Sequence, residues 1–165
     1  MTALITSQQM EDTWRAVGAF SNSEIRKRQA LCGKEQEELT GFVLGFASDL
    51  PTEALGLALY VHFVVVEAFR RSGYKFARIT PAKIDLAWKN NSAFVNELRA
   101  AGRTRMPLSL PAGTASEPAV MQYVIDALME ESDDDPVALA DDDFWHIVQV
   151  LKTVADCLHD ARRGK

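Results

Sequence analysis

Residues 54–66 form the longest nearly unbroken apolar run in the chain, and this run constrains the fold more than any other feature. Pro51 favours a helix start just before the run, and the helical pattern continues to about Arg71, apolar on nearly every side until Glu67. A helix that is apolar all round has to be enclosed by other helices. The run is shorter than the roughly 20 residues that a bilayer span requires. We therefore expect a buried central helix at about residues 53–71 and no membrane span.

The other segments repeat apolar residues at the three-to-four spacing of helices, and none alternates cleanly as a strand would. In the first segment, Met10, Trp14 and Val17 share one face and predict an inward stripe. Ser7 and Ser116 are expected to cap the helices that begin beside them. The sequence thus predicts an all-α fold, a compact array of six or seven helices around the central one; the further helices are expected at about residues 7–20, 24–31, 34–48, 81–101, 117–131 and 141–158.

Two segments interrupt the helical pattern. Residues 102–115 carry two prolines and two glycines with little periodicity, which predicts a long loop or hinge. Residues 132–140 are expected to form an acidic loop. A chain of 165 residues can bury roughly 70% of its unfolded surface around one core, so we expect residues 1–165 to form a single helical domain.

Charge is sorted into blocks along the chain. Residues 70–105 hold nine Lys or Arg against two acids, a local balance of +7. Residues 117–143 hold ten Asp or Glu and no base, a local balance of −10. The net charge of −5 therefore conceals a strong internal asymmetry. Such asymmetry favours association with an oppositely charged partner, or with a second copy of the chain.

We therefore predict a non-enzymatic protein that acts through protein contact. Its partner would be a second copy, forming a homodimer in which opposite blocks meet, or another protein with a basic surface. The surface expected to make this contact combines both blocks and comprises Arg70, Arg71, Lys75, Arg78, Asp133, Asp134, Asp135, Asp141 and Asp142.

Nucleic-acid binding by residues 70–83 is an alternative, because this segment interleaves bases with Tyr74 and Phe76. Cations would neutralise phosphates and the rings would stack on bases. Against this alternative stand a pI near 5.2 and an acidic block that would repel phosphate. A competing interpretation is that both rings anchor a connection between helices to the core.

A small-molecule or metal enzyme with a pocket between helices is the second alternative. Its candidate polar residues are His62, Glu67 and Tyr60. His62 and Glu67 are five positions apart in the chain, which places them about 140° apart around a helix. Asp156 and His159 have a spacing that metal sites use, but both fall off the inward stripe of their helix. The chain also lacks nucleophile, phosphate-loop and EF-hand motifs, so we expect no cofactor and no metal.

The N-terminal residues 1–14 have neither the basic region nor the apolar region of a secretory signal. Cys32 and Cys157 stand 125 positions apart, and neither has a Cys or His neighbour at metal-ligand spacing. Two isolated cysteines of this kind favour free thiols in a reducing compartment. We therefore expect a cytoplasmic protein.

Overall fold

The computed structural model describes residues 2–100, 115–130 and 139–164. Seven helices and two short strands are found in these residues, in agreement with the predicted all-α class. The elements are α1 (Ser7–Gly18), α2 (Asn22–Glu35), α3 (Glu37–Ala47), α4 (Thr52–Arg71), β1 (Lys75–Phe76), α5 (Pro81–Ala100), α6 (Pro118–Met129), α7 (Asp141–Ala161) and β2 (Arg162–Arg163).

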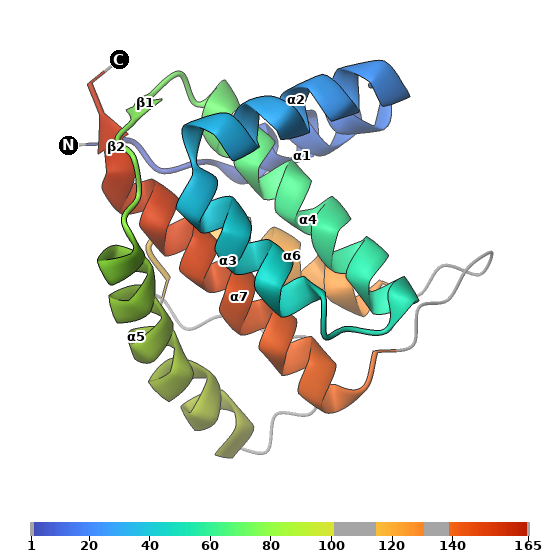
Figure 1. The fold of residues 1–165 in the computed structure, drawn as a ribbon, viewed down its shortest axis with the longest axis vertical. Helices are drawn as coiled ribbons and strands as arrows, with labels where there is room; N and C mark the ends of the chain where they lie inside the picture. The colour runs from blue at the N-terminus through green and yellow to red at the C-terminus, as the bar shows by residue number, and fades with distance from the viewer. Residues whose placement is uncertain (1, 101–114, 131–138, 165) are drawn as a thin grey trace.

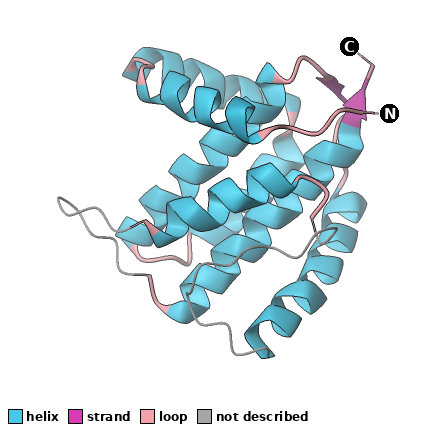
Figure 2. Cartoon of the chain, turned by 180° about the vertical axis from the view of Figure 1, so that it is seen from behind, coloured by secondary structure: helices cyan, strands magenta, loops and turns pink. Residues whose placement is uncertain are grey.

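Helices α4 and α7 pack against each other and share the core (Figure 1). Helix α5 lies along one side of α7, and α3 contacts α4, α5 and α7. Helix α2 crosses the top of the array in Figure 1. On the other side, α1, α4 and α6 all contact one another, and α1 and α6 come to the front when the molecule is seen from behind (Figure 2).

Two helices, rather than one, form the centre of the array. The predicted central helix α4 buries ten of its 20 residues, including the run from Val61 to Val66 apart from the half-buried His62. Helix α7 buries 14 of its 21 residues. Its apolar stripe packs into the core. Its polar residues Lys152 and Thr153 are also buried, and both form hydrogen bonds with Asn91 of α5. Periodicity alone does not predict burial of that polar face.

Helix α4 is also the one described helix that is long and apolar enough to cross a bilayer. Its most apolar window has a mean hydropathy of 1.5, and 56% of that window is buried inside the array. A core helix of a soluble protein meets the same criteria, so this property of α4 is weak evidence for a membrane span.

The break between α2 and α3 lies at Gln36, not at Gly33 as a glycine stop would predict. The Gln36 side chain is buried, donates to the carbonyl of Ala77 at 2.9 Å and accepts from the N–H of Ile79 at 3.0 Å. These two bonds attach the helix junction to the segment that follows β1. Gly33 remains inside α2.

The two predicted serine caps are wrong. Thr6 caps α1, because its hydroxyl accepts from the N–H of Gln9 at 3.1 Å and the Gln9 side chain bonds back to the N–H of Thr6. Ser116 does not cap α6, because its hydroxyl donates to Asp156 on α7. Local sequence signals therefore located these helix starts to within one residue but did not identify the capping contacts.

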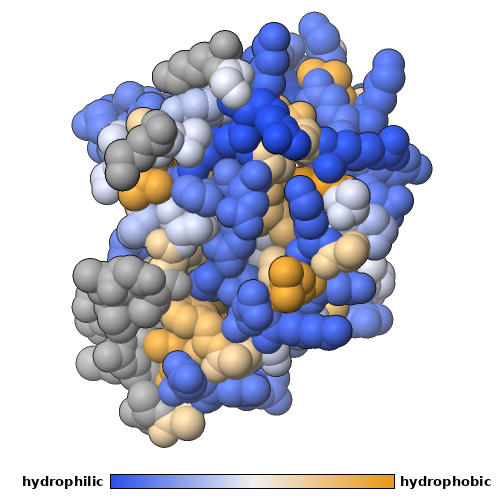
Figure 3. Space-filling view, turned by 90° about the vertical axis from the view of Figure 1, so that its left-hand side faces the viewer, coloured by the Kyte–Doolittle hydropathy of each residue, from blue (hydrophilic) through white to orange (hydrophobic). Residues whose placement is uncertain are grey.

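Two two-residue strands join the middle of the chain to its end. Lys75 pairs with Arg163 and Phe76 with Arg162 in antiparallel register, and the N–H of Ala77 donates to the carbonyl of Ala161 at 2.8 Å. Both termini lie beside this pair of strands (Figure 1). Figure 3 shows this side of the molecule, and its upper part is mainly hydrophilic.

The C-terminal end of α4 provides a test of backbone conformation. Gly73 has a φ of +81°, and it is the one described glycine in the left-handed region. Gly73→Ala is therefore expected to lower the free energy of unfolding by about 1–2 kcal/mol. Gly56→Ala is the matched control: within α4, a β-carbon at Gly56 has nothing within 4 Å, so helix propensity should raise the free energy by about 0.5–1 kcal/mol. Urea unfolding of both variants would show opposite signs, and equal signs would contradict this assignment.

Candidate partner-binding surface

The predicted acidic contact residues fall in two places. Asp133, Asp134 and Asp135 lie outside the described residues. Asp141 and Asp142 are exposed in the first turn of α7, where carboxylates favour the positive end of the helix dipole. Asp142 forms an ion pair with Arg99 of α5, so at this point the two charge blocks meet within one chain.

Two of the four predicted basic residues, Arg70 and Arg78, pair with acids that lie outside the acidic block. Arg70 lies 2.8 Å from the carboxylate of Glu35 and 3.9 Å from that of Glu67. Arg78 lies 2.8 Å from the carboxylate of Glu37. The block of +7 is therefore partly neutralised by α2, α3 and α4.

Arg71 and Lys75 are exposed, and neither forms an ion pair with a described residue. Each lies close in the chain to a paired base, Arg71 beside Arg70 and Lys75 near Arg78. The structure thus divides the four basic candidates evenly between paired and unpaired side chains.

The two aromatic residues of the basic segment are attached to the fold. The Tyr74 hydroxyl accepts from the N–H of Ala3 at 3.1 Å, and its ring lies under the guanidinium of Arg162 at 5.3 Å. Phe76 packs edge-on against Phe69, with ring centroids 6.2 Å apart. Both rings are half-buried and already in contact, which favours their anchoring role over base stacking.

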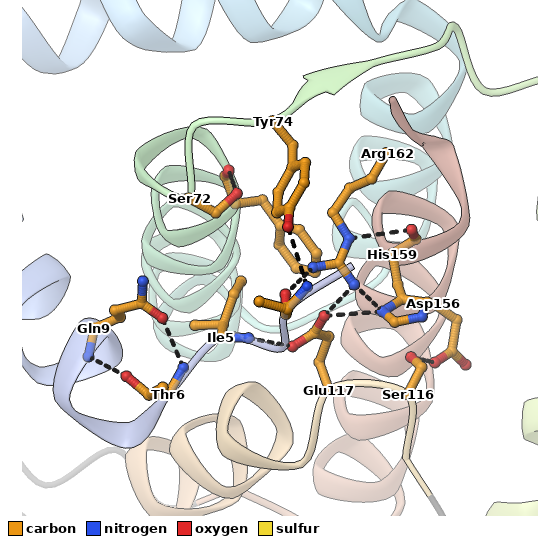
Figure 4. A network of polar contacts seen from close by, with 12 residues as sticks. Ile5, Thr6, Gln9, Ser72, Tyr74, Ser116, Glu117, Asp156, His159 and Arg162 are labelled. Atoms are coloured by element: carbon orange, nitrogen blue, oxygen red, sulfur yellow. Dashed lines mark hydrogen bonds and ion pairs between the residues drawn. The ribbon is translucent and has the colours of Figure 1, made fainter. Parts of the chain in front are cut away.

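Glu117 belongs to the acidic block by sequence, but it is fully buried (Figure 4). Its Oε1 lies 2.6 Å from the guanidinium of Arg162 and 2.8 Å from Nδ1 of His159, and its Oε2 accepts from the N–H of Ile5 at 2.8 Å. Arg162 also donates to the carbonyl of Ala3 at 2.9 Å. This cluster joins the N-terminal segment, α6 and the end of α7, and it leaves Glu117 unavailable to a partner.

Asp156 and His159 lie off the buried stripe of α7, as predicted, but both are half-buried and hydrogen-bonded to other elements. Asp156 Oδ2 accepts from Lys152 at 2.8 Å and from Asn91 of α5 at 3.0 Å, while His159 contacts Glu117. Helix α7 is enclosed on both faces, so residues off its apolar stripe still point into the protein. Because each of these groups is already hydrogen-bonded within the fold, the arrangement is that of a structural network.

His62 and Glu67 line one cavity in spite of their angular separation on α4. This cavity of about 330 Å³ lies between α2, α3 and α4. The Glu67 carboxylate forms ion pairs with Arg28 at 2.7 Å and with Arg70 at 3.9 Å. Among the described residues, no three His, Cys, Asp or Glu side chains gather closely enough to hold a metal ion. Tyr60 points elsewhere, to the opposite side of the array.

That opposite side carries a surface cavity of about 730 Å³ between α1, α4 and α6, which we call the trough. Trp14 and Tyr60 remain 46% and 42% exposed on its walls, large fractions for such big side chains. The acids of the trough are Asp126, Glu130 and Glu11, the last of which is paired with Arg15, and none of its described lining residues is Lys, Arg or His. The apolar side chains along it include Met10, Trp14, Leu57, Tyr60, Tyr123 and Met129.

The electrostatics of the trough favour a cation. Burial raises the pKa of Tyr60, and the carboxylate of Glu130 adds to that rise. Burial likewise raises the pKa of Tyr123, with smaller contributions from Tyr60 and Glu130. Both phenols therefore stay neutral at physiological pH. The buried hydroxyl of Tyr123 has no hydrogen-bond partner among the described residues, so it can still accept or donate a bond.

Sequence reasoning missed the trough because it assigned Trp14 to the core. The buried face of α1 is formed by Met10, Thr13 and Val17, and Trp14 lies beside that face. Thr13 replaces an apolar residue on the inner face because its hydroxyl donates to the carbonyl of Gln9 at 2.7 Å. The sequence did contain one relevant signal. Glu11 stands three positions before Trp14, and an acid on that side of the helix favours a partly exposed position for the tryptophan.

Comparisons with family models, with curated proteins and with solved structures found no match for this chain.

Proposed function

We propose that this chain is a non-enzymatic cytoplasmic protein that binds a protein partner in the trough. The partner would present a segment that is basic and apolar, such as an amphipathic helix with Lys or Arg beside its apolar face. The single observation behind this proposal is that exposed aromatic side chains and three carboxylates line one cavity, with no base among its described lining residues.

The chemistry of the trough side chains suits such a segment. Tryptophan and tyrosine dominate the energetics of many protein interfaces, because they bury a large area at low entropic cost. The electron-rich faces of Trp14 and Tyr60 also attract cations. Glu11, Asp126 and Glu130 would meet the basic side chains at the border and speed association at low salt. An apolar helix face would fill the groove between α1 and α6.

A second copy of the chain is a less favoured occupant. The sequence predicts that whole charge blocks pair between copies, but Asp142 pairs with Arg99 and Arg78 with Glu37 inside one protomer. Unpaired bases near the strands, such as Lys75 and Arg71, are still able to approach the trough of another molecule. Self-association is therefore one outcome that the experiment below distinguishes.

A fluorescence titration tests the proposal. The probe is an amphipathic helical peptide of leucine and lysine, and the comparison is the matching peptide of leucine and glutamate. We expect the lysine peptide to change the tryptophan emission, to which the exposed Trp14 contributes, with a micromolar Kd that weakens as salt rises, and the glutamate peptide to give no change. Sedimentation velocity without peptide reports self-association directly.

Variants locate the binding site. A Trp14→Ser, Tyr60→Ser double variant, titrated by peptide fluorescence anisotropy, should weaken lysine-peptide binding at least tenfold. Leu86→Ser is the matched control, because Leu86 is 63% exposed on α5, away from the trough. Equal binding of the two peptides, or equal binding by the double variant and the wild type, would overturn the proposal. A salt-dependent dimer abolished by the double variant would assign the trough to a second copy instead.

A further inference from the structure

The cavity between α2, α3 and α4 is separate from the trough. It lies on the far side of α4 from Tyr60, and it shares no lining residue with the trough. Most of its wall is apolar, with Val43, Leu59, Phe63 and Val66 among the lining residues. Its volume of about 330 Å³ is at the lower end of the range for ligand pockets, and about 150 Å³ suffices for benzene. The space therefore suits a ring with a short side chain.

His62 lines this cavity and has one ring nitrogen without a partner among the described residues. Its Nδ1 is buried and forms no hydrogen bond with any described residue. Burial lowers the pKa of His62 to about 4, so the imidazole is neutral at physiological pH. A neutral imidazole nitrogen either donates or accepts one bond, depending on the tautomer. Most buried polar groups are satisfied, and an unsatisfied one calls for a missing partner.

The charges at the cavity wall are already balanced. The guanidinium of Arg28 lies 2.7 Å from the carboxylate of Glu24 and 2.7 Å from that of Glu67. Neither a cationic nor an anionic ligand would find an uncompensated opposite charge there, and either would lose its hydration on entry. These conditions select an uncharged ligand.

Helix α2 forms the outer wall of the cavity. It has no buried residue, yet Arg28, Gln29 and Cys32 on its inner side cover the cavity. The other walls come from α3 and α4, whose apolar faces are fixed in the core. Arg28 holds α2 to the buried carboxylate of Glu67 at 2.7 Å, so an outward movement of this helix has to break that ion pair.

We propose that this cavity binds an uncharged small molecule with an apolar body and one hydroxyl group, a phenol or an alcohol, whose hydroxyl bonds to His62. A hydroxyl fits either tautomer of the ring because it both donates and accepts. The apolar body occupies the space lined by Val43, Phe63 and Val66. This site is independent of the trough.

Calorimetric titrations with three compounds of similar shape test the proposal: p-ethylphenol, ethylbenzene and p-ethylbenzoate. We expect p-ethylphenol to bind about tenfold more tightly than ethylbenzene, as one hydrogen bond to an otherwise unsatisfied group would provide. The charged p-ethylbenzoate should not bind. Absence of p-ethylphenol binding, or equal affinity for p-ethylphenol and ethylbenzene, would overturn the proposal.

Three variants identify the cavity and the bonding group. His62→Leu removes the nitrogen but keeps an apolar wall, so it should retain ethylbenzene binding and lose the preference for p-ethylphenol. Thr40→Phe fills the cavity and should abolish binding of both compounds. Tyr123→Phe removes the other buried polar group that has no partner among the described residues, a hydroxyl beside the trough, and should change neither affinity. A preference for p-ethylphenol that persists in His62→Leu, or disappears in Tyr123→Phe, would contradict the assignment.

Discussion

Replacing Arg162 by methionine is expected to lower the free energy of unfolding by about 3–5 kcal/mol. The side chains of Arg162 and Glu117 are 1% and 0% exposed, and they form an ion pair at 2.6 Å. Removal of the guanidinium leaves the buried Glu117 carboxylate with only His159 and one backbone N–H, and it also releases the carbonyl of Ala3. Denaturant unfolding followed by circular dichroism measures the loss.

Arg163→Met provides the matched control, because Arg163 is the exposed neighbour of Arg162 in β2. Substitution of this surface residue should change the free energy of unfolding by less than about 0.5 kcal/mol. If both variants lost the same amount, the stabilisation would come from the β1–β2 pairing or from general charge, and the buried cluster would not have the role assigned to it.

The second large effect is a dependence of stability on pH through His62. Its pKa falls from 6.5 to about 4 on folding because burial disfavours the imidazolium form. Between these two pH values the unfolded chain binds a proton that the folded chain does not, so the free energy of unfolding decreases as pH falls. The full change corresponds to about 3 kcal/mol. Above pH 6.5 and below pH 4 the contribution of His62 is constant.

Carboxylates titrate in part of the same range, so the informative quantity is a difference between two proteins. Leucine in place of His62 cannot bind a proton, while every carboxylate remains. Chemical unfolding of the wild type and of His62→Leu at pH 6.5 and pH 4 should show that the wild type loses about 3 kcal/mol more than the variant. A difference that does not change with pH would show that His62 has the same pKa in both states.

Helix existence was readily predicted, because three-to-four periodicity reflects burial of one face. Helix α5 begins at Pro81, and α4 ends at Arg71 just before Gly73, close to their predicted bounds. The bounds that differed depend on long-range contacts. The junction at Gln36 follows from bonds to Ala77 and Ile79, about 40 positions away, and no local pattern reports such a contact.

The candidate sites were predicted less completely. Trp14 satisfied the apolar spacing of α1 but lies at the edge of the buried face, since Thr13 can enter the core through a backbone hydrogen bond. Glu117 was counted with the surface acids because its partner Arg162 is 45 positions away. The separation between His62 and Glu67 along α4 was estimated correctly as an angle, but a cavity that spans several residues can border both.

The charge blocks are present in the sequence, but the fold pairs several of their charges within one chain. Arg70 and Arg78 are paired with acids of α2 and α3, and Asp142 is paired with Arg99. Much of the asymmetry along the chain is therefore balanced within the protein. The acidic surface that coincides with exposed aromatic residues is the trough, and it receives Glu11 from outside the acidic block, although Glu11 is itself paired with Arg15.

Whether the trough is the recognition surface is tested by chemical-shift mapping with the leucine–lysine peptide. Isotope-labelled protein would be titrated with the peptide at moderate salt. We expect the perturbed amides and side chains to cluster on α1, α4 and α6, with Trp14, Tyr60 and Tyr123 among the most affected. Perturbations centred instead on Asp141 and Asp142 at the start of α7, with α1 and α6 unchanged, would contradict this expectation.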